Sequence, residues 1–246
     1  MKKKTGMTLA ETLITLTIIG VVISIVFPII INSSNDAKYK ALLKKQYSSL
    51  SQATIYAANK NDGTLKGIPL FHIPLLQLML PSLNTIQVCS DWQSFSDGHY
   101  PGCPSCSPPI PESWHTVPNP CFKSATFKGL NGSNLTLGWP DQAGAILSDG
   151  STILLCHQSV NCTSNGVGNE PDSLGLGAIY NTATTCGTIL LDVNGYAEPN
   201  RMGKDIYEFW ILKDKLVPYG TNDNMTNTCN TASTGIGCAA EYLKNN

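Results

Sequence analysis

The sequence is poor in charged residues. Only 13% of its 246 residues are Asp, Glu, Lys or Arg, and the formal net charge is −1. An average soluble domain has ~25% charged residues. A general nucleic-acid binder needs a strongly basic surface, so this balance excludes nucleic acid as a partner. Apolar residues are not scarce, since 42% of the chain is hydrophobic, and this fraction excludes wholesale disorder.

Signatures of common enzyme classes are also missing. The chain has no G-x-S-x-G, no P-loop, no H-E-x-x-H and no complete G-x-G-x-x-G motif. No segment repeats at a fixed period, which excludes a solenoid. We therefore expect a protein that is not an enzyme and whose function rests on local features.

Cysteine, by contrast, is abundant. Nine cysteines in a chain of this length indicate an oxidising compartment. Because nine is odd, at least one thiol stays outside the disulfides or joins another chain. Four cysteines lie in or beside residues 101–120, a segment rich in proline, and we expect them to form disulfide staples: Cys89, Cys103, Cys106 and Cys121. The sequence leaves the pairing of Cys156, Cys162 and Cys186 open.

The same segment has two alternative interpretations. Cys103 and Cys106 have the spacing of a thioredoxin-type redox pair, but such pairs follow a strand at a helix N-terminus, and prolines surround this one. Together with His99 and His115 they offer four zinc ligands, in a spacing that matches no standard zinc finger. Structural disulfides are the better interpretation.

The N-terminus begins with three lysines and continues into an apolar run. Residues 12–31 contain no charged side chain, and this length of helix spans a bilayer core. The preceding lysines predict a cytoplasmic N-terminus and an exported remainder. A secretory signal has a shorter apolar stretch and a small-residue cleavage site, both absent here. Glu11 stands out, because a carboxylate in hydrocarbon costs ~2.5–3.5 kcal/mol or more and calls for a cationic partner.

The segment KKKTGMTLAETLITLTIIGVVISIVFP resembles the N-terminus of type IV prepilins and type II secretion pseudopilins. The resemblance implies that a prepilin peptidase cuts after Gly6, and that Met7 becomes a methylated N-terminal residue. Glu11 is then the fifth mature residue, the acidic position of the family. In a staggered stack of helices, its carboxylate can meet the Met7 amine of a neighbouring subunit and set the register.

The resemblance also implies a function and its partners. The chain would be a structural subunit (a pilin, minor pilin or pseudopilin) of a type IV pilus or type II secretion filament. It would be anchored once in the inner membrane with its head exported, and would contact lipid before assembly. Its partners would be the peptidase, an inner-membrane assembly platform and other pilin-like subunits in a helical filament. The alternatives are a tip-located binding subunit that uses the loop at residues 89–121, or an exported enzyme or metal protein on an uncleaved anchor.

A long helix is expected at residues 7–60. Its second half carries an apolar stripe with helical spacing: Tyr39, Leu43, Tyr47, Leu50, Ala53 and Ala57. Gly20 and Pro28 lie where pilin helices often carry these residues, and Pro28 should kink or locally melt the helix. The expected organisation is a leader at residues 1–6, the helix with its membrane and assembly segment at 7–31, and a head at 61–246.

The head predicts an α+β fold. A short helix is expected between Pro69 and Pro81, and strands at residues 143–147, 152–156, 186–193 and 205–213. Asp149–Gly150 between the first two is a hairpin signal. About four antiparallel strands would therefore form a small sheet on the long helix, with loops stapled by disulfides. The resemblance to pilins further favours a C-terminal loop closed by Cys229 and Cys238.

One group of oxygen-bearing side chains suggests calcium as a cofactor. The residues are Asp192, Asn194, Asn200 and Asp205, and the start of this stretch, DVNG, is similar to the start of a calcium loop. The alternative, which we prefer, is a β-turn at Asn194–Gly195 in which Asn200 and Asp205 bind the loop backbone.

Overall fold

A computed structural model describes residues 8–69, 72–89, 121, 126–136, 143–157, 159–163, 185–221 and 229–244. Two compact units are present, Met1–Ala41 and Leu42–Asn246. Gly6 and Met7 lie outside the described residues, as do the cysteines and histidines of the redox and zinc readings: His99, Cys103, Cys106 and His115.

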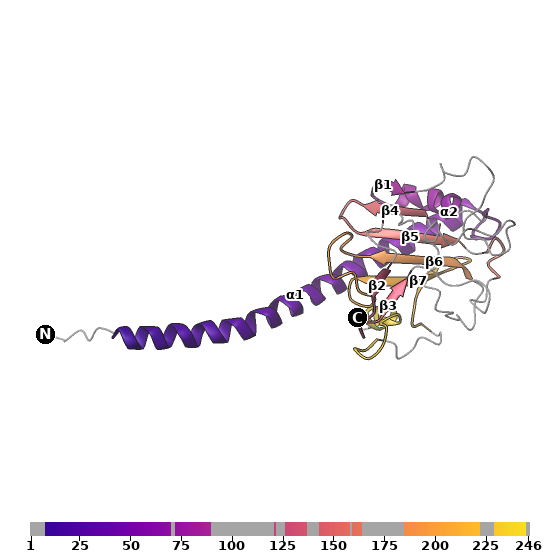
Figure 1. Ribbon diagram of the computed structural model, residues 1–246. Helices are drawn as coiled ribbons and strands as arrows, with labels where there is room; N and C mark the ends of the chain where they lie inside the picture. The colour runs from indigo at the N-terminus through magenta and orange to yellow at the C-terminus, as the bar shows by residue number, and fades with distance from the viewer. Residues whose placement is uncertain are drawn as a thin grey trace. The chain divides into compact units, whose positions relative to one another are not determined.

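Helix α1 (Leu9–Lys60) contains 52 residues and is the longest element (Figure 1). The backbone is helical at Pro28 and on both sides of it, so of the kink or local melting expected there, the melting does not occur. Proline removes one N–H donor from the helix. Unwinding a further turn of an apolar segment would expose several more backbone groups, which is costlier than the one lost bond.

The head contains a six-stranded antiparallel sheet in the order β1-β4-β5-β6-β7-β8. The strands from β1 to β7 of this sheet can be followed in Figure 1. Its strands are β1 (Thr85–Cys89), β4 (Ala143–Leu147), β5 (Thr152–His157), β6 (Thr185–Asp192), β7 (Ile206–Leu212) and β8 (Leu216–Pro218). A separate hairpin pairs β2 (Thr126–Lys128) with β3 (Asn134–Thr136). The α+β class is confirmed.

The expected number of strands was too low. The four central strands lie where their apolar runs predict them, but β1 and β8 add an edge on either side. Strand β8 is three residues long and ends at Pro218, and three of the five residues of β1 are exposed. Strand β8 is buried but too short for a strand signal, and β1 lacks the buried apolar run that marks a central strand.

Short helices complete the described part of the head. Helix α2 (His72–Met79) lies between Pro69 and Pro81 as predicted, and a 3-10 turn (Leu80–Ser82) follows it. Helix α3 (Cys238–Lys244) lies near the C-terminus.

Both faces of the central strands are buried, which explains their continuous apolar sequence. Side chains alternate between the faces of a strand. On one face, Phe209 stacks with Tyr47 of α1 at a ring-centroid distance of 5.7 Å. On the other, Trp210 stacks with Tyr219 at 4.2 Å. The buried stripe of α1, with Leu43, Leu50, Ala53 and Ala57 at 0% exposure, continues this core.

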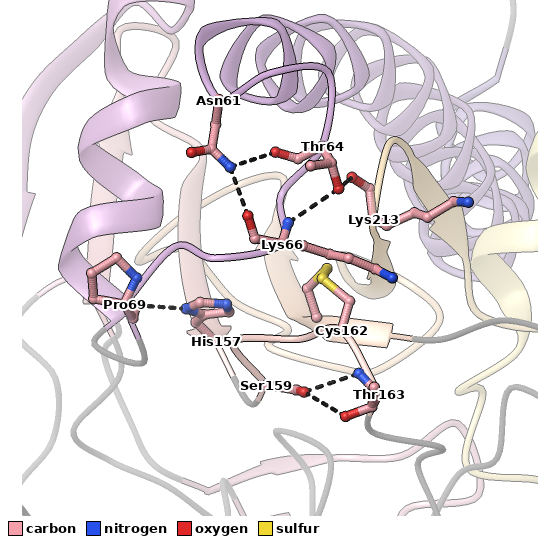
Figure 2. Close-up of a disulfide and its surroundings, with 10 residues drawn as sticks. Asn61, Thr64, Lys66, Pro69, His157, Ser159, Cys162, Thr163 and Lys213 are labelled. Carbon is pink, nitrogen blue, oxygen red and sulfur yellow. Dashed lines mark hydrogen bonds between the residues drawn. A yellow bond between two sulfur atoms is a disulfide. The ribbon is translucent and has the colours of Figure 1, made fainter.

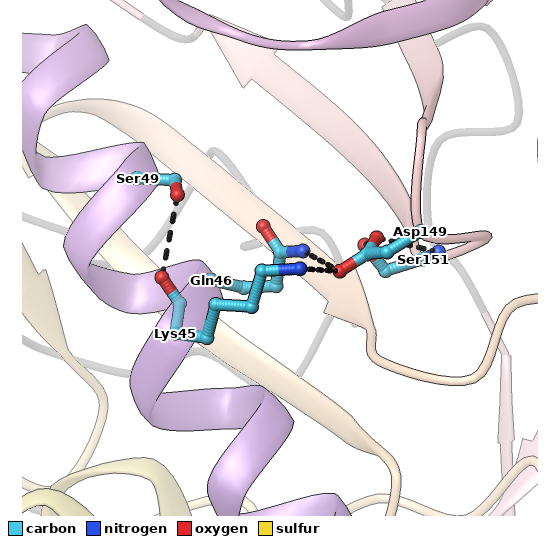
Figure 3. Close-up of polar contacts among 5 residues, drawn as sticks. All are labelled: Lys45, Gln46, Ser49, Asp149 and Ser151. Atoms are coloured by element: carbon cyan, nitrogen blue, oxygen red, sulfur yellow. Dashed lines mark hydrogen bonds and ion pairs between the residues drawn. The ribbon is translucent and has the colours of Figure 1, made fainter.

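The turn between β4 and β5 is tied to α1 by Asp149 (Figure 3). Its Oδ2 accepts hydrogen bonds from Lys45 Nζ at 2.7 Å and from Gln46 Nε2, while its Oδ1 accepts from the backbone and hydroxyl of Ser151. Partial burial opposes ionisation, but the bonds from Lys45 and Ser151 outweigh it and lower the pKa of Asp149. The hairpin predicted at Asp149–Gly150 thus also anchors the helix.

Replacing Asp149 by alanine should lower the free energy of unfolding by about 1–2 kcal/mol, because it leaves the buried Gln46 amide without its acceptor. The matched variant Lys45→Ala removes only an ion pair whose lysine side chain is 59% exposed, and should cost about 0.5 kcal/mol. Chemical unfolding of the detergent-solubilised chain measures both. Equal losses in the two variants would contradict this ranking.

Candidate functional site

The first part of α1 is the candidate assembly segment. Residues Leu9–Pro28 have a mean hydropathy of 2.3, and none of their side chains is buried. By length and composition this stretch can cross a membrane. An apolar helix with no covered face requires lipid or other helices around it.

Glu11 lies in the first turn of this helix and is bonded to Thr8. Its Oε2 accepts hydrogen bonds from the backbone N–H of Thr8 at 2.7 Å and from the Thr8 hydroxyl at 2.9 Å. In return, the N–H of Glu11 donates to Thr8 Oγ1 at 3.3 Å. This reciprocal arrangement is a capping box, which satisfies donors that a helix start leaves unpaired.

The capping box gives Glu11 a partner within its own chain. The T-x-x-E spacing that produces it is visible in the sequence, although the partner predicted for Glu11 is a cation of another subunit. A carboxylate that accepts two hydrogen bonds is cheaper to place near hydrocarbon than one that accepts none. It can still accept a hydrogen bond from a cation of a neighbouring chain, because a carboxylate has about four acceptor sites.

The other polar side chains of the segment bond only to their own helix. The hydroxyls of Thr12 and Thr17 donate to carbonyls three or four residues earlier, as do those of Thr15 and Ser24. Such bonds satisfy the hydroxyl donors within the helix, so that they need no partner in an apolar environment. A Cβ added at Gly20 would meet nothing within 4 Å, so this glycine offers room for a close neighbour. Glu11 is the one charged side chain described in the segment.

Three disulfides are described in the head: Cys89–Cys121, Cys162–Cys186 and Cys229–Cys238. The first closes the proline-rich segment, and the last closes the C-terminal loop that the resemblance to pilins favoured. The second settles one pair of the group that the sequence left open, and leaves Cys156 as a buried thiol.

The Cys162–Cys186 disulfide ties the segment after β5 to the start of β6, and Figure 2 shows its surroundings. Nearby, His157 Nδ1 lies 3.0 Å from the carbonyl oxygen of Pro69. Burial lowers the pKa of His157, so its neutral ring donates to this carbonyl. The contact fixes the chain before α2, and it gives His157 a packing role.

Asp192 and Asp205 are both buried and lie close enough to repel each other electrostatically. Burial and this repulsion raise the pKa of Asp192 to about 8, and burial raises the pKa of Asp205. Each carboxylate accepts backbone hydrogen bonds: Asp192 from Asn194 at 3.1 Å, and Asp205 from Asn200 at 2.8 Å and Arg201 at 2.7 Å.

The four residues considered for calcium thus belong to one loop, and their contacts match the β-turn reading. Gly195 has a φ of +62°, and a Cβ there would lie 2.2 Å from the Gly150 oxygen, so glycine is required at this turn. The acids accept hydrogen bonds from backbone amides of the loop. Among the described residues no three His, Cys, Asp or Glu side chains gather in a metal-like group.

Comparison with known proteins adds evidence for the N-terminal segment. Residues 1–27 match the family described as the prokaryotic N-terminal methylation motif. No curated protein and no solved structure matches the chain. The motif covers the basic leader, Glu11 and most of the apolar run. This match supports the resemblance of the N-terminal segment to type IV pilin-like proteins and pseudopilins.

Proposed function

We propose that the chain is a structural subunit of a type IV pilus or type II secretion filament. In this proposal a prepilin peptidase removes residues 1–6, and the subunit assembles through residues 7–31. The observation that carries it is the N-terminal methylation motif, which coincides with an uncovered apolar helix. The carboxylate of Glu11 at the start of that helix supplies the charge that aligns one subunit with the next.

Subunit pairing follows from the charges that processing would create. Cutting after Gly6 removes three lysines and frees an α-amine on Met7, which is largely protonated near neutral pH. Methylation keeps its charge. Glu11 is then the acidic partner for the amine of an adjacent subunit, and an ion pair in an apolar bundle disfavours every stagger that leaves a charge unpaired.

Substitution of Gly6 by leucine should leave the leader attached. A peptidase that cuts after glycine needs the small residue to fit the backbone into its site, and leucine fills that space. Intact-mass measurement of the membrane-extracted protein should show a chain of full length for Gly6→Leu.

Thr5→Ala is the matched control for this cut. It should give the same shortened and methylated chain as the wild type. A wild-type protein that retains residues 1–6 would refute the proposed processing and favour an uncleaved anchor.

A second role, that of a tip subunit with a binding loop, has one supporting observation. Cys89 and Cys121 join positions 32 residues apart, and so they hold the ends of the proline-rich segment together. Quantitative mass spectrometry of sheared filaments separates the roles. A major subunit dominates the filament fraction, whereas a tip subunit is a trace component.

A further inference from the structure

The tip of the β2–β3 hairpin carries an asparagine held in one position. Asn131 is exposed, and its Oδ1 accepts hydrogen bonds from the backbone N–H of Ser133 at 3.0 Å and from the Ser133 hydroxyl at 2.7 Å. Gly129 leaves room for this carboxamide, since a Cβ there would lie 2.8 Å from Asn131 Oδ1. The side chain is therefore folded back over its own turn.

The next residue is Gly132, with a φ of +82° and nothing within 4 Å of its Cβ position. An asparagine followed by glycine can cyclise, because no side chain obstructs attack by the following backbone nitrogen. Here that nitrogen donates its N–H to the Gly129 oxygen at 3.0 Å, and cyclisation breaks this bond. The two Ser133 donors point at the oxygen on which negative charge develops during that attack. Donors placed in this way stabilise an oxyanion.

We propose that Asn131 is a site of spontaneous modification, at which water converts the asparagine to aspartate or isoaspartate. The Gly132 nitrogen forms a bond with Cγ of Asn131, the Cγ–Nδ2 bond breaks, and the proton of the Gly132 N–H leaves with the departing ammonia. Water then opens the succinimide ring at either carbonyl. The net reaction exchanges ammonia for water and needs no oxidant or reductant.

A second asparagine–glycine pair in the described residues is held differently. Asn194 donates from Nδ2 to the Glu198 oxygen at 3.1 Å and from its backbone to Asp192 at 3.1 Å. Gly195 packs closely against Gly150, since a Cβ added at Gly195 would lie 2.2 Å from the Gly150 oxygen. Cyclisation at Asn194 would have to break this packing, so the fold protects it. The pair Asn165–Gly166 lies outside the described residues.

Modification at Asn131 would reach the C-terminal loop. The N–H groups of Leu130 and Asn131 donate to the oxygens of Thr234 at 3.0 Å and Ser233 at 2.9 Å, inside the loop that Cys229–Cys238 closes. Aspartate adds a negative charge beside these bonds. Isoaspartate adds a carbon to the main chain after the Asn131 N–H and shifts β3 against β2 from Gly132 onward, which disturbs the turn that presents these N–H groups to the loop.

The test is incubation of the purified full-length chain in detergent at mildly alkaline pH, followed by peptide mass spectrometry. In the folded chain Asn131 should convert about tenfold faster than Asn194, and in denaturant the two rates should become similar. Ser133→Ala should slow Asn131 by roughly threefold and leave Asn194 unchanged. Equal rates at the two sites in the folded chain, or no effect of Ser133→Ala, would overturn the proposal.

Discussion

Replacement of Glu11 by leucine is expected to abolish filament assembly while the leader is still removed. The variant loses the one charge described in the apolar segment, and with it the partner for the Met7 amine of a neighbouring subunit. Filament in the sheared fraction should fall by more than tenfold. Intact mass reports processing in the same samples.

We expect Glu11→Leu to lose the correct axial register between neighbouring subunits rather than the attraction between them. A leucine in place of Glu11 packs well with other apolar helices, and the hydrophobic contact between subunits remains. What disappears is the penalty for a wrong stagger, because the unpaired carboxylate no longer disfavours it. We expect the variant to remain in the membrane fraction as unassembled subunits.

Two variants control for helix start and polarity. Glu11→Gln keeps side-chain hydrogen bonding to Thr8 but lacks the charge, so it should fail to assemble as Glu11→Leu does. Thr12→Val, one residue further along, removes a hydroxyl bonded only to its own helix and should assemble normally. Normal filament yield from Glu11→Leu would refute the pairing of Glu11 with the Met7 amine of a neighbouring subunit. Normal yield from Glu11→Gln alone would show that Glu11 acts in assembly through the capping box.

Local features of the fold were predictable from the sequence. Helix α1 follows from its uncharged run and apolar stripe, and the β4–β5 hairpin from Asp149–Gly150 between two apolar segments. Each of these signals is contained in a few neighbouring residues. The local effect of Pro28 on this helix was not predictable in this way, because the propensity of one residue does not weigh the cost of unwinding its surroundings.

Features that join distant parts of the chain were not predictable. The Cys162–Cys186 disulfide depends on β6 lying beside β5, and no spacing rule shows this. The loop after β6 was predictable in part. Its residues, from Asp192 to Asp205, were recognised as a group, but the repulsion between two buried acids requires three-dimensional proximity.

The largest pH effect is expected at Asp192. Its folded-state pKa of about 8 lies above its ordinary value near 3.8, because of burial and the neighbouring Asp205. Between these two pH values the folded chain holds a proton that the unfolded chain has released. The free energy of unfolding therefore falls as pH rises through this window, by up to ~1.4 kcal/mol per pH unit. Below the window the contribution does not change with pH.

Asp192→Asn should remove this dependence. The amide is neutral at every pH and its oxygen can accept the hydrogen bond from Asn194, so the variant should gain stability over the wild type progressively as pH rises from 4 to 8. Thermal unfolding followed by tryptophan fluorescence measures the gain, since Trp210 is fully buried. Parallel pH profiles of the two proteins would show that Asp192 ionises normally in the folded state.

Calcium added at the alkaline end of this window distinguishes the two readings of the loop. A bound cation would neutralise Asp192 and Asp205, raise the midpoint of the wild type and leave Asp192→Asn unaffected. We expect no calcium shift in either protein, because the carboxylates accept backbone hydrogen bonds within the loop and no third acidic side chain joins them among the described residues. A shift confined to the wild type would instead establish the loop as a calcium site, with the raised pKa as a property of its empty form.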